Sequence, residues 1–130
     1  MLPAEIQGLI EAHINAFNTN DNNAFYEVFS DNAIIVDGIA PFCWPNPNGP
    51  EKWMADVAKW REGLGVVKEH LSYEMGFSIV EGSSAYAVVS GTLTVTLKDQ
   101  SIVRMGMLSY TFAKRDGVWK IGAQAWGRTS

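Results

Sequence analysis

The second half of the chain alternates between apolar and polar residues almost without interruption from Val66 to Arg128. This period of two is typical of β-strands that have one buried face. Turn-forming residues at 81–84, 98–100 and 115–117 divide the segment, so four strands are expected. A strand of about 15 residues spans roughly 50 Å, and strands of this length must curve to remain within a small domain.

Glycines mark the places where these strands are expected to bend. Four glycines each interrupt a strand, and strand glycines are common at bulges and bends: Gly76, Gly91, Gly106 and Gly122. In the strand that begins at Val66, the apolar residues at 71, 73, 75, 77 and 79 are expected to share one face. A sheet that curls around a helix leaves a cone-shaped hollow, and this hollow is where a ligand would bind.

The first half of the chain predicts helices around one further strand. Apolar residues at helical spacing indicate a helix over Ala4–Asn18, and Asp21 is a suitable N-cap for a short second helix. A strand follows over Ala33–Val36, and Pro50 opens a third helix that extends to about Glu62. The order α-α-β-α-β-β-β-β predicts an α+β fold, with an antiparallel sheet and helices on one face.

Two titratable residues occupy positions where acid or base chemistry is possible. His13 is the one polar residue within the apolar stripe of the first helix, and Asp37 directly follows the first strand. An interior imidazole and a carboxylate at a strand end together suggest a buried acid–base site. The alternatives are a core histidine bonded to a backbone carbonyl and a carboxylate that only caps an Asp-Gly turn.

The segment between the first strand and the third helix contains four of the five prolines, so no continuous helix or strand is expected there. It also contains Phe42 and Trp44, which a purely solvated loop would not carry. We interpret the segment as a packed lid or rim of the hollow. Four tryptophans, taken singly, are more often core residues than ligand-stacking groups: Trp44, Trp53, Trp60 and Trp126.

Two polar strand residues are compatible with more than one location. His70 precedes Leu71 on the polar face of its strand, which favours a solvated or interface histidine over a pocket residue. Arg104 shares strand parity with Leu108 and Tyr110. It therefore lies either deep in the hollow or at an edge of the sheet.

Composition limits the partners, cofactors and cellular locations that are expected for the chain. The 130 residues suffice for one domain, 1–130, and 47% of them are hydrophobic. The net charge of −4 and the scattered Lys and Arg residues argue against nucleic acid as a partner. Cys43 is the only cysteine, and we expect no disulfide, no metal site and no cofactor. Neither a signal peptide nor a membrane-spanning stretch is recognisable, so a cytoplasmic location is expected.

The chain resembles the nuclear transport factor 2-like superfamily, in its SnoaL-like and ketosteroid-isomerase-like branch. The resemblance rests on Ile14–Asp21, on Phe29–Asp37 and on the closing Asp116–Ile121, and it extends over essentially the whole chain. It implies a strongly curved, cone-shaped sheet wrapped around N-terminal helices, the cystatin-like fold. Because this fold hosts isomerases, dehydratases, cyclases and non-catalytic binders, the resemblance constrains the fold more than the activity.

The resemblance also implies positions for site residues. In ketosteroid isomerases a helix tyrosine donates a hydrogen bond to the oxyanion and a strand-end aspartate shuttles the proton; His13 and Asp37 occupy those positions here. The second oxyanion donor is replaced by Leu108, and the Pro-rich loop has no counterpart in those enzymes. The ligand-binding residues expected for the pocket are Phe42, Trp44, Trp53, Leu108, Tyr110, Gln124 and Trp126.

Three functions follow as hypotheses. The first is a cofactor-free isomerase, lyase or cyclase that transfers a proton on an apolar or aromatic metabolite, with Asp37 as base and His13 as hydrogen-bond donor or partner acid. The second is a non-catalytic small-molecule binder, and the third is a structural dimerisation module. A homodimer is expected through the uncharged outer face of the sheet, formed by Tyr86, Val88, Thr92, Thr94 and Thr96.

Overall fold

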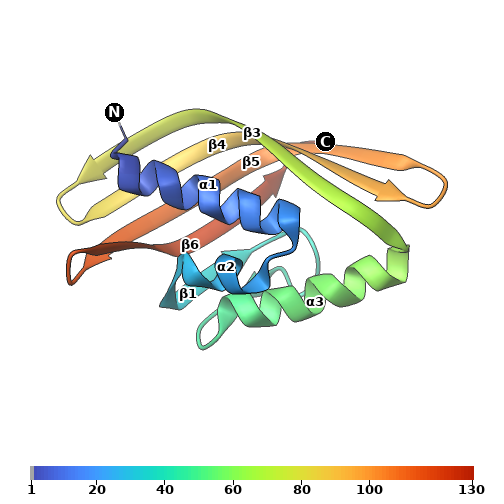
Figure 1. The fold of residues 1–130 in the computed structure, drawn as a ribbon, viewed down its shortest axis with the longest axis horizontal. Coiled ribbons are helices and arrows are strands. Elements are labelled where there is room, and N and C mark those ends of the chain that lie inside the picture. The colour runs from blue at the N-terminus through green and yellow to red at the C-terminus, as the bar shows by residue number, and fades with distance from the viewer. Residues whose placement is uncertain (1) are drawn as a thin grey trace.

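A single bent sheet and three helices make up the part of the chain that the computed structural model describes, residues 2–130 (Figure 1). The elements follow the order α1 (Ala4–Thr19), α2 (Asn22–Glu27), β1 (Phe29–Val36), β2 (Cys43–Trp44), α3 (Gly49–Leu64), β3 (Val66–Glu81), β4 (Ser84–Leu97), β5 (Ser101–Arg115) and β6 (Val118–Arg128). The predicted α+β cone is confirmed. No helix within residues 2–130 is long and apolar enough to cross a membrane.

The strands are arranged in the order β2-β1-β6-β5-β4-β3. The four long strands are antiparallel neighbours, as predicted from their short connecting turns. β1, however, runs parallel to β6, with Ile35 opposite Gln124. A parallel pair needs a long crossover, and here everything from β2 to β5 separates the two strands along the chain. The two-residue strand β2, which the prolines concealed, pairs with β1.

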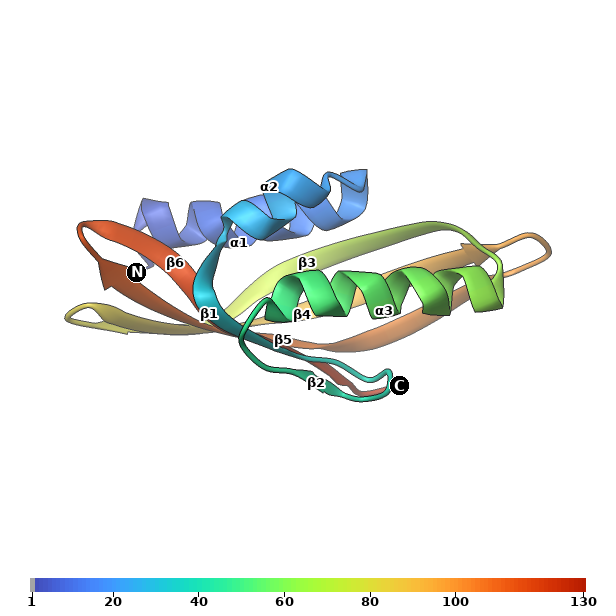
Figure 2. The same cartoon turned by 90° about the horizontal axis from the view of Figure 1, so that it is seen from below.

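The helices cover the concave face of the sheet, and their apolar stripes form the core with it (Figure 2). Ile6, Ile10 and Ile14 of α1 are almost completely buried, as the predicted stripe requires. On the sheet side, the core includes Val89 of β4 and Tyr110 of β5. The long strands therefore have one packed face and one open face.

A bulge in β3 changes which side chains face the core. Met75 pairs with Val89 but Ser78 pairs with Ala87, so β3 contains one extra residue at this point. The alternation reverses there, and Phe77 and Ile79 lie on the outer face, where Phe77 is 61% exposed. The expectation that they share a face with Leu71 is therefore wrong, because period two holds only while the pairing register is continuous.

The start of α3 is fixed closely against the sheet by Gly49. A Cβ at this position would lie 2.5 Å from the carbonyl oxygen of Trp44 and 2.6 Å from that of Ala33. Only a residue without a side chain allows this approach. The contact sets α3 beside the end of β1, where Asp37 follows.

Candidate functional site

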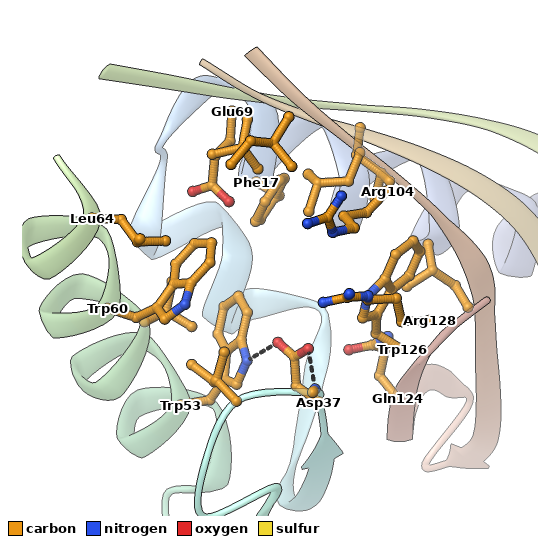
Figure 3. Close-up of a pocket in the computed structure, with 18 of the residues that line it drawn as sticks. Phe17, Asp37, Trp53, Trp60, Leu64, Glu69, Arg104, Gln124, Trp126 and Arg128 are labelled. Atoms are coloured by element: carbon orange, nitrogen blue, oxygen red, sulfur yellow. Dashed lines mark hydrogen bonds between the residues drawn. The ribbon is translucent and has the colours of Figure 1, made fainter. Parts of the chain in front are cut away.

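A cavity of about 360 Å³ lies between the concave face of the sheet and the helices α1 and α3 (Figure 3). Apolar side chains form most of its wall, and six of its residues are polar or charged. The lining residues are His13, Phe17, Asp37, Gly38, Ile39, Trp53, Val57, Trp60, Leu64, Glu69, Leu71, Leu93, Val95, Ile102, Arg104, Leu108, Gln124, Trp126 and Arg128. Its size is within the range of small-molecule sites, roughly 300–1,000 Å³.

One face of α3 supplies the aromatic side of the cavity. Trp53, Val57, Trp60 and Leu64 recur at spacings of three and four residues, so they form one stripe on the helix. Trp53 also stacks on Phe25 in the core, with ring centroids 5.2 Å apart. The aromatic wall is therefore held rigidly by the core behind it.

Asp37 places a carboxylate in this cavity. The indole Nε1–H of Trp53 donates a hydrogen bond of 2.8 Å to Asp37 Oδ2, and the backbone N–H of Gly38 donates one of 2.6 Å to Oδ1 (Figure 3). Desolvation raises the pKa of Asp37, while the two hydrogen bonds lower it and only partly offset the burial. The carboxylate is thus fixed in position and more basic than an exposed aspartate.

His13 also lines the cavity, and a residue from a distant strand holds its ring. His13 Nδ1 and the hydroxyl oxygen of Tyr110 are 2.7 Å apart and share a hydrogen bond. Burial lowers the pKa of His13 from 6.5 to about 3, so the imidazole is neutral at physiological pH. Burial also raises the pKa of Tyr110, whose hydroxyl stays protonated. Within residues 2–130 no hydrogen bond joins His13 to Asp37, although both side chains reach the same cavity.

Comparison with known proteins places this fold in a family. The SnoaL-like domain family matches residues 3–123. The chain belongs to this SnoaL-like family. A comparison of the SnoaL-like domain with curated protein sequences finds no match.

Solved structures similar to this SnoaL-like domain include proteins of several kinds. A hexachlorocyclohexane dehydrochlorinase from Novosphingobium barchaimii is 18% identical, with a TM-score of 0.79, over 98% of this chain and 86% of that one. A ketosteroid isomerase-like protein from Erwinia carotovora is 16% identical, with a TM-score of 0.80, over 98% and 95%. An uncharacterised cystatin-like protein from Caulobacter vibrioides is 21% identical, with a TM-score of 0.76, over 97% and 88%. At these identities the similarity is one of fold.

Of the ligand-binding residues predicted for the SnoaL-like domain, four line the cavity: Trp53, Leu108, Gln124 and Trp126. Tyr110 lies behind His13 and is completely buried. Phe42 and Trp44 are not on the cavity wall: Phe42 is 57% exposed, and Trp44 is buried and donates a hydrogen bond of 2.8 Å to Asp56 of α3. Because β2 pairs Trp44 with the inward Ile35, its side chain packs under α3 rather than over the cavity.

Strand parity accounts for the charged residues that the strands contribute to the cavity, including Glu69 and Arg128, which no sequence pattern singled out. Arg128 follows Gln124 and Trp126 on the inner face of β6, and Glu69 lies opposite the inward Val95. Arg104 lies opposite Leu93 and also lines the cavity, whereas His70 is exposed on the outer face. Every second residue of β6 faces inward at this end, so the position after Gln124 and Trp126 in this series is Arg128.

No group of three or more His, Cys, Asp or Glu residues between positions 2 and 130 is arranged to hold a metal ion. The polar groups of the cavity instead come from five parts of the chain: His13 from α1, Asp37 from the end of β1, Glu69 from β3, Arg104 from β5, and Gln124 and Arg128 from β6. Such an arrangement is suited to hydrogen bonding and proton transfer on an organic molecule.

Proposed function

We propose that this SnoaL-like domain binds a small apolar or aromatic metabolite in the cavity and transfers a proton on it without a cofactor, as an isomerase, lyase or cyclase does. The observation that supports this most directly is the Asp37 carboxylate, held by two hydrogen bonds inside an aromatic-lined cavity. A positioned carboxylate with a raised pKa is suited to act as a general base.

Asp37 has acceptor capacity left for this role. An ionised carboxylate accepts about four hydrogen bonds, and Trp53 and Gly38 together use two of these positions. The same two donors keep the carboxylate from rotating. A C–H group of a ligand seated against Trp53 would therefore meet a fixed base rather than a mobile one.

For His13 we propose the role of a neutral hydrogen-bond donor. A pKa of about 3 argues against a protonated general acid near neutral pH. If the Tyr110 hydroxyl donates to Nδ1, the second ring nitrogen of His13 carries the hydrogen and is free to donate to a ligand oxygen. In this arrangement Tyr110 positions His13 and does not itself contact the ligand.

The names of the structural neighbours agree with a proton-transfer reaction. One is a dehydrochlorinase and another is ketosteroid isomerase-like. Elimination of HCl and isomerisation of a ketone both begin with removal of a proton from carbon. A non-catalytic binder is the second candidate, because the neutral His13 and the fixed Asp37 would equally orient a ligand that does not react. The cavity volume disfavours a purely structural role.

Hydrogen–deuterium exchange tests the proposed base. A panel of cyclic and aryl ketones is incubated with the protein in D₂O, and exchange at the carbon next to the carbonyl is followed by proton NMR. We expect Asp37→Asn to slow the exchange by about 10²–10⁴-fold while leaving the binding of the same ketone largely unchanged.

Asp56→Asn is the matched control, because Asp56 accepts an indole hydrogen bond from Trp44 as Asp37 does from Trp53, yet lies away from the cavity. This variant should exchange protons at the wild-type rate. A ketone that binds the wild type without any exchange would favour the non-catalytic binder, and equal rates for wild type and Asp37→Asn would exclude Asp37 as the base.

A further inference from the structure

Neither of two arginines that line the cavity, Arg104 and Arg128, has an aspartate or glutamate side chain as a partner within residues 2–130. Arg104 donates from Nη1 to the carbonyl oxygen of its neighbour Val103 at 3.2 Å, and Arg128, which is exposed, donates from Nε to a main-chain oxygen of Ser130. Within residues 2–130, the only ion pair joins Arg61 to Glu69. The guanidinium groups of Arg104 and Arg128 therefore have most of their five donors available.

The charges that line the cavity do not balance. Glu69 is neutralised by Arg61, whose guanidinium also lies over the ring of Phe17 at 5.6 Å. Asp37 is then the single free carboxylate facing two guanidinium groups. Counted over these side chains alone, the result is a surplus of one positive charge, although the whole chain carries a net charge of −4. A partly enclosed cavity favours a ligand that cancels such a surplus.

A buried amide beside the arginines also lacks a partner. Gln124 is only 6% exposed, and its Nε2 has no hydrogen bond within residues 2–130. Buried polar groups are almost always bonded, so an orphaned amide in a cavity wall indicates a missing partner. Rotation about its last torsion exchanges the two ends of the amide, which lets the NH₂ group meet a ligand oxygen.

These polar groups lie on one side of the cavity, next to Trp126, and the aromatic side chains of α3 lie on the other side. Figure 3 shows Arg104, Arg128 and Gln124 together, facing Trp53 and Trp60 across the cavity, with Asp37 between the two sides. The arrangement follows from topology, since β5 and β6 are neighbours in the sheet and α3 covers the opposite side. A ligand that fits both sides has a charged end and an apolar body.

We propose that the ligand is an apolar or aromatic carboxylic acid, bound with its carboxylate on Arg104 and Arg128 beside Gln124 and its body against Trp53 and Trp60. The proposal rests on the proposed function, because it names the ligand class of the same cavity. Guanidinium groups match the planar carboxylate and bind it with paired hydrogen bonds. One negative charge cancels the surplus, whereas a phosphate dianion would exceed it.

Binding of matched acids and amides tests this proposal without requiring turnover. The probes are 2-naphthoate and 3-phenylpropanoate, with 2-naphthamide and 3-phenylpropanamide as uncharged counterparts, and calorimetry measures each affinity. We expect the wild type to bind at least one acid tenfold or more tightly than its amide. Equal affinity for both, or no binding of either acid, would overturn the proposal.

Substitution of the two arginines tests where the carboxylate of the ligand binds. Arg104→Gln and Arg128→Gln should each reduce the acid-over-amide preference to about threefold or less while leaving the affinity for the amide nearly unchanged. Arg115→Gln is the control, because it removes the same charge from an exposed residue at the end of β5 and should preserve the preference. If a Gln variant does not fold, Arg104→Lys replaces it and should retain part of the preference. Loss of preference in Arg115→Gln alone would contradict the proposed location.

Asp37→Asn separates this proposal from the proposed function. It removes the one carboxylate that repels the ligand's charge, so acid binding should be unchanged or tighter even where proton exchange is lost. An acid preference with no exchange in any variant would support the ligand class and exclude the proposed base. Exchange that depends on Asp37 without an acid preference would do the reverse.

Discussion

Burial of His13 makes the stability of the protein depend on acidity. The unfolded chain takes up a proton on this residue near pH 6.5, whereas the folded protein takes it up only near pH 3. Between these values the unfolded state binds more protons, so the free energy of unfolding falls as the pH is lowered. The slope from one such proton is at most about 1.4 kcal/mol per pH unit.

We therefore expect His13→Gln to lose stability less steeply than the wild type between pH 6.5 and pH 4, as measured by urea unfolding at several pH values. The comparison of the two slopes isolates His13, because both proteins contain Asp37. Asp37 acts in the opposite direction, since its raised pKa makes the folded state take up a proton first as the pH falls. Parallel slopes in wild type and variant would show that His13 is not held neutral by the fold.

Trp53 adjusts the basicity of Asp37. Its indole hydrogen bond favours the ionised carboxylate, so removing it should raise the pKa of Asp37 further above its ordinary value. We expect Trp53→Phe to shift the carbon NMR titration of the Asp37 carboxyl group to higher pH. Trp44→Phe removes the equivalent bond to Asp56 and should leave the Asp37 titration unchanged. A lower pKa in Trp53→Phe would contradict this role.

For single residues, sequence patterns predicted the face on which a side chain lies but not the residue that it contacts. The helical stripe predicted that His13 points inward, and the end of the strand predicted where Asp37 lies. The hydrogen bond between His13 and Tyr110 joins residues 97 positions apart. Such a contact depends on how α1 crosses the sheet, and no local periodicity contains that information. The direction of the Trp44 side chain depends on the chain path in the same way, because only the pairing of β2 with β1 turns it inward.

Paired glycines in neighbouring strands shape the floor of the cavity. Gly91 and Gly106 lie opposite each other in β4 and β5, and the ring of Trp126 occupies the space above them. A Cβ on Gly106 would lie 2.6 Å from the carbonyl oxygen of Gly127 and 2.7 Å from the Trp126 ring. The absence of two side chains thus allows an aromatic ring to line the cavity.

We expect Gly106→Ala to destabilise the protein by about 1–3 kcal/mol, because the backbone of β6 must move to accommodate the methyl group. Urea unfolding measures the loss, and ligand binding should weaken with it as Trp126 is displaced. Gly8→Ala is the control: Gly8 lies within α1 with no atom within 4 Å of a new Cβ, so alanine should stabilise by about 0.5–1 kcal/mol. Equal effects at the two sites would argue against the close contact.

At the scale of elements, the sequence was most informative where structure is local. The four long strands and three helices were predicted to within a few residues, because alternation, helical stripes and turn residues act over short distances. The parallel pairing of β1 with β6 depends on the whole chain path, and the bulge at Gly76 depends on the register with β4. Neither feature can be recognised from the residue pattern of one strand alone.

The open face of the sheet is the surface through which we predict a homodimer. Around Thr94, the face includes Val103 and Met105, which are 52% and 54% exposed, and it carries the predicted row of threonines on β4. A flat surface of this kind suits isologous pairing with a second copy.

Light scattering at micromolar concentration should give twice the mass of the chain. Thr94→Lys places a charge opposite Val103 and should convert the protein to a monomer without unfolding the domain. Gln7→Lys, on the exposed side of α1, adds the same charge elsewhere and should remain dimeric. A monomeric wild type would refute the predicted dimer.

The position of β6 between β1 and β5 determines when the molecule can assemble. β1 and β2 are synthesised early. The strand that joins them to the rest of the sheet is β6, which leaves the ribosome after β3, β4 and β5. Until Val118–Arg128 emerges, β1 and β5 both present unpaired edges, which are the sites where chains associate wrongly. Completion of the sheet therefore waits for β6, and a chain that ends before Val118 would leave the edges of both β1 and β5 exposed.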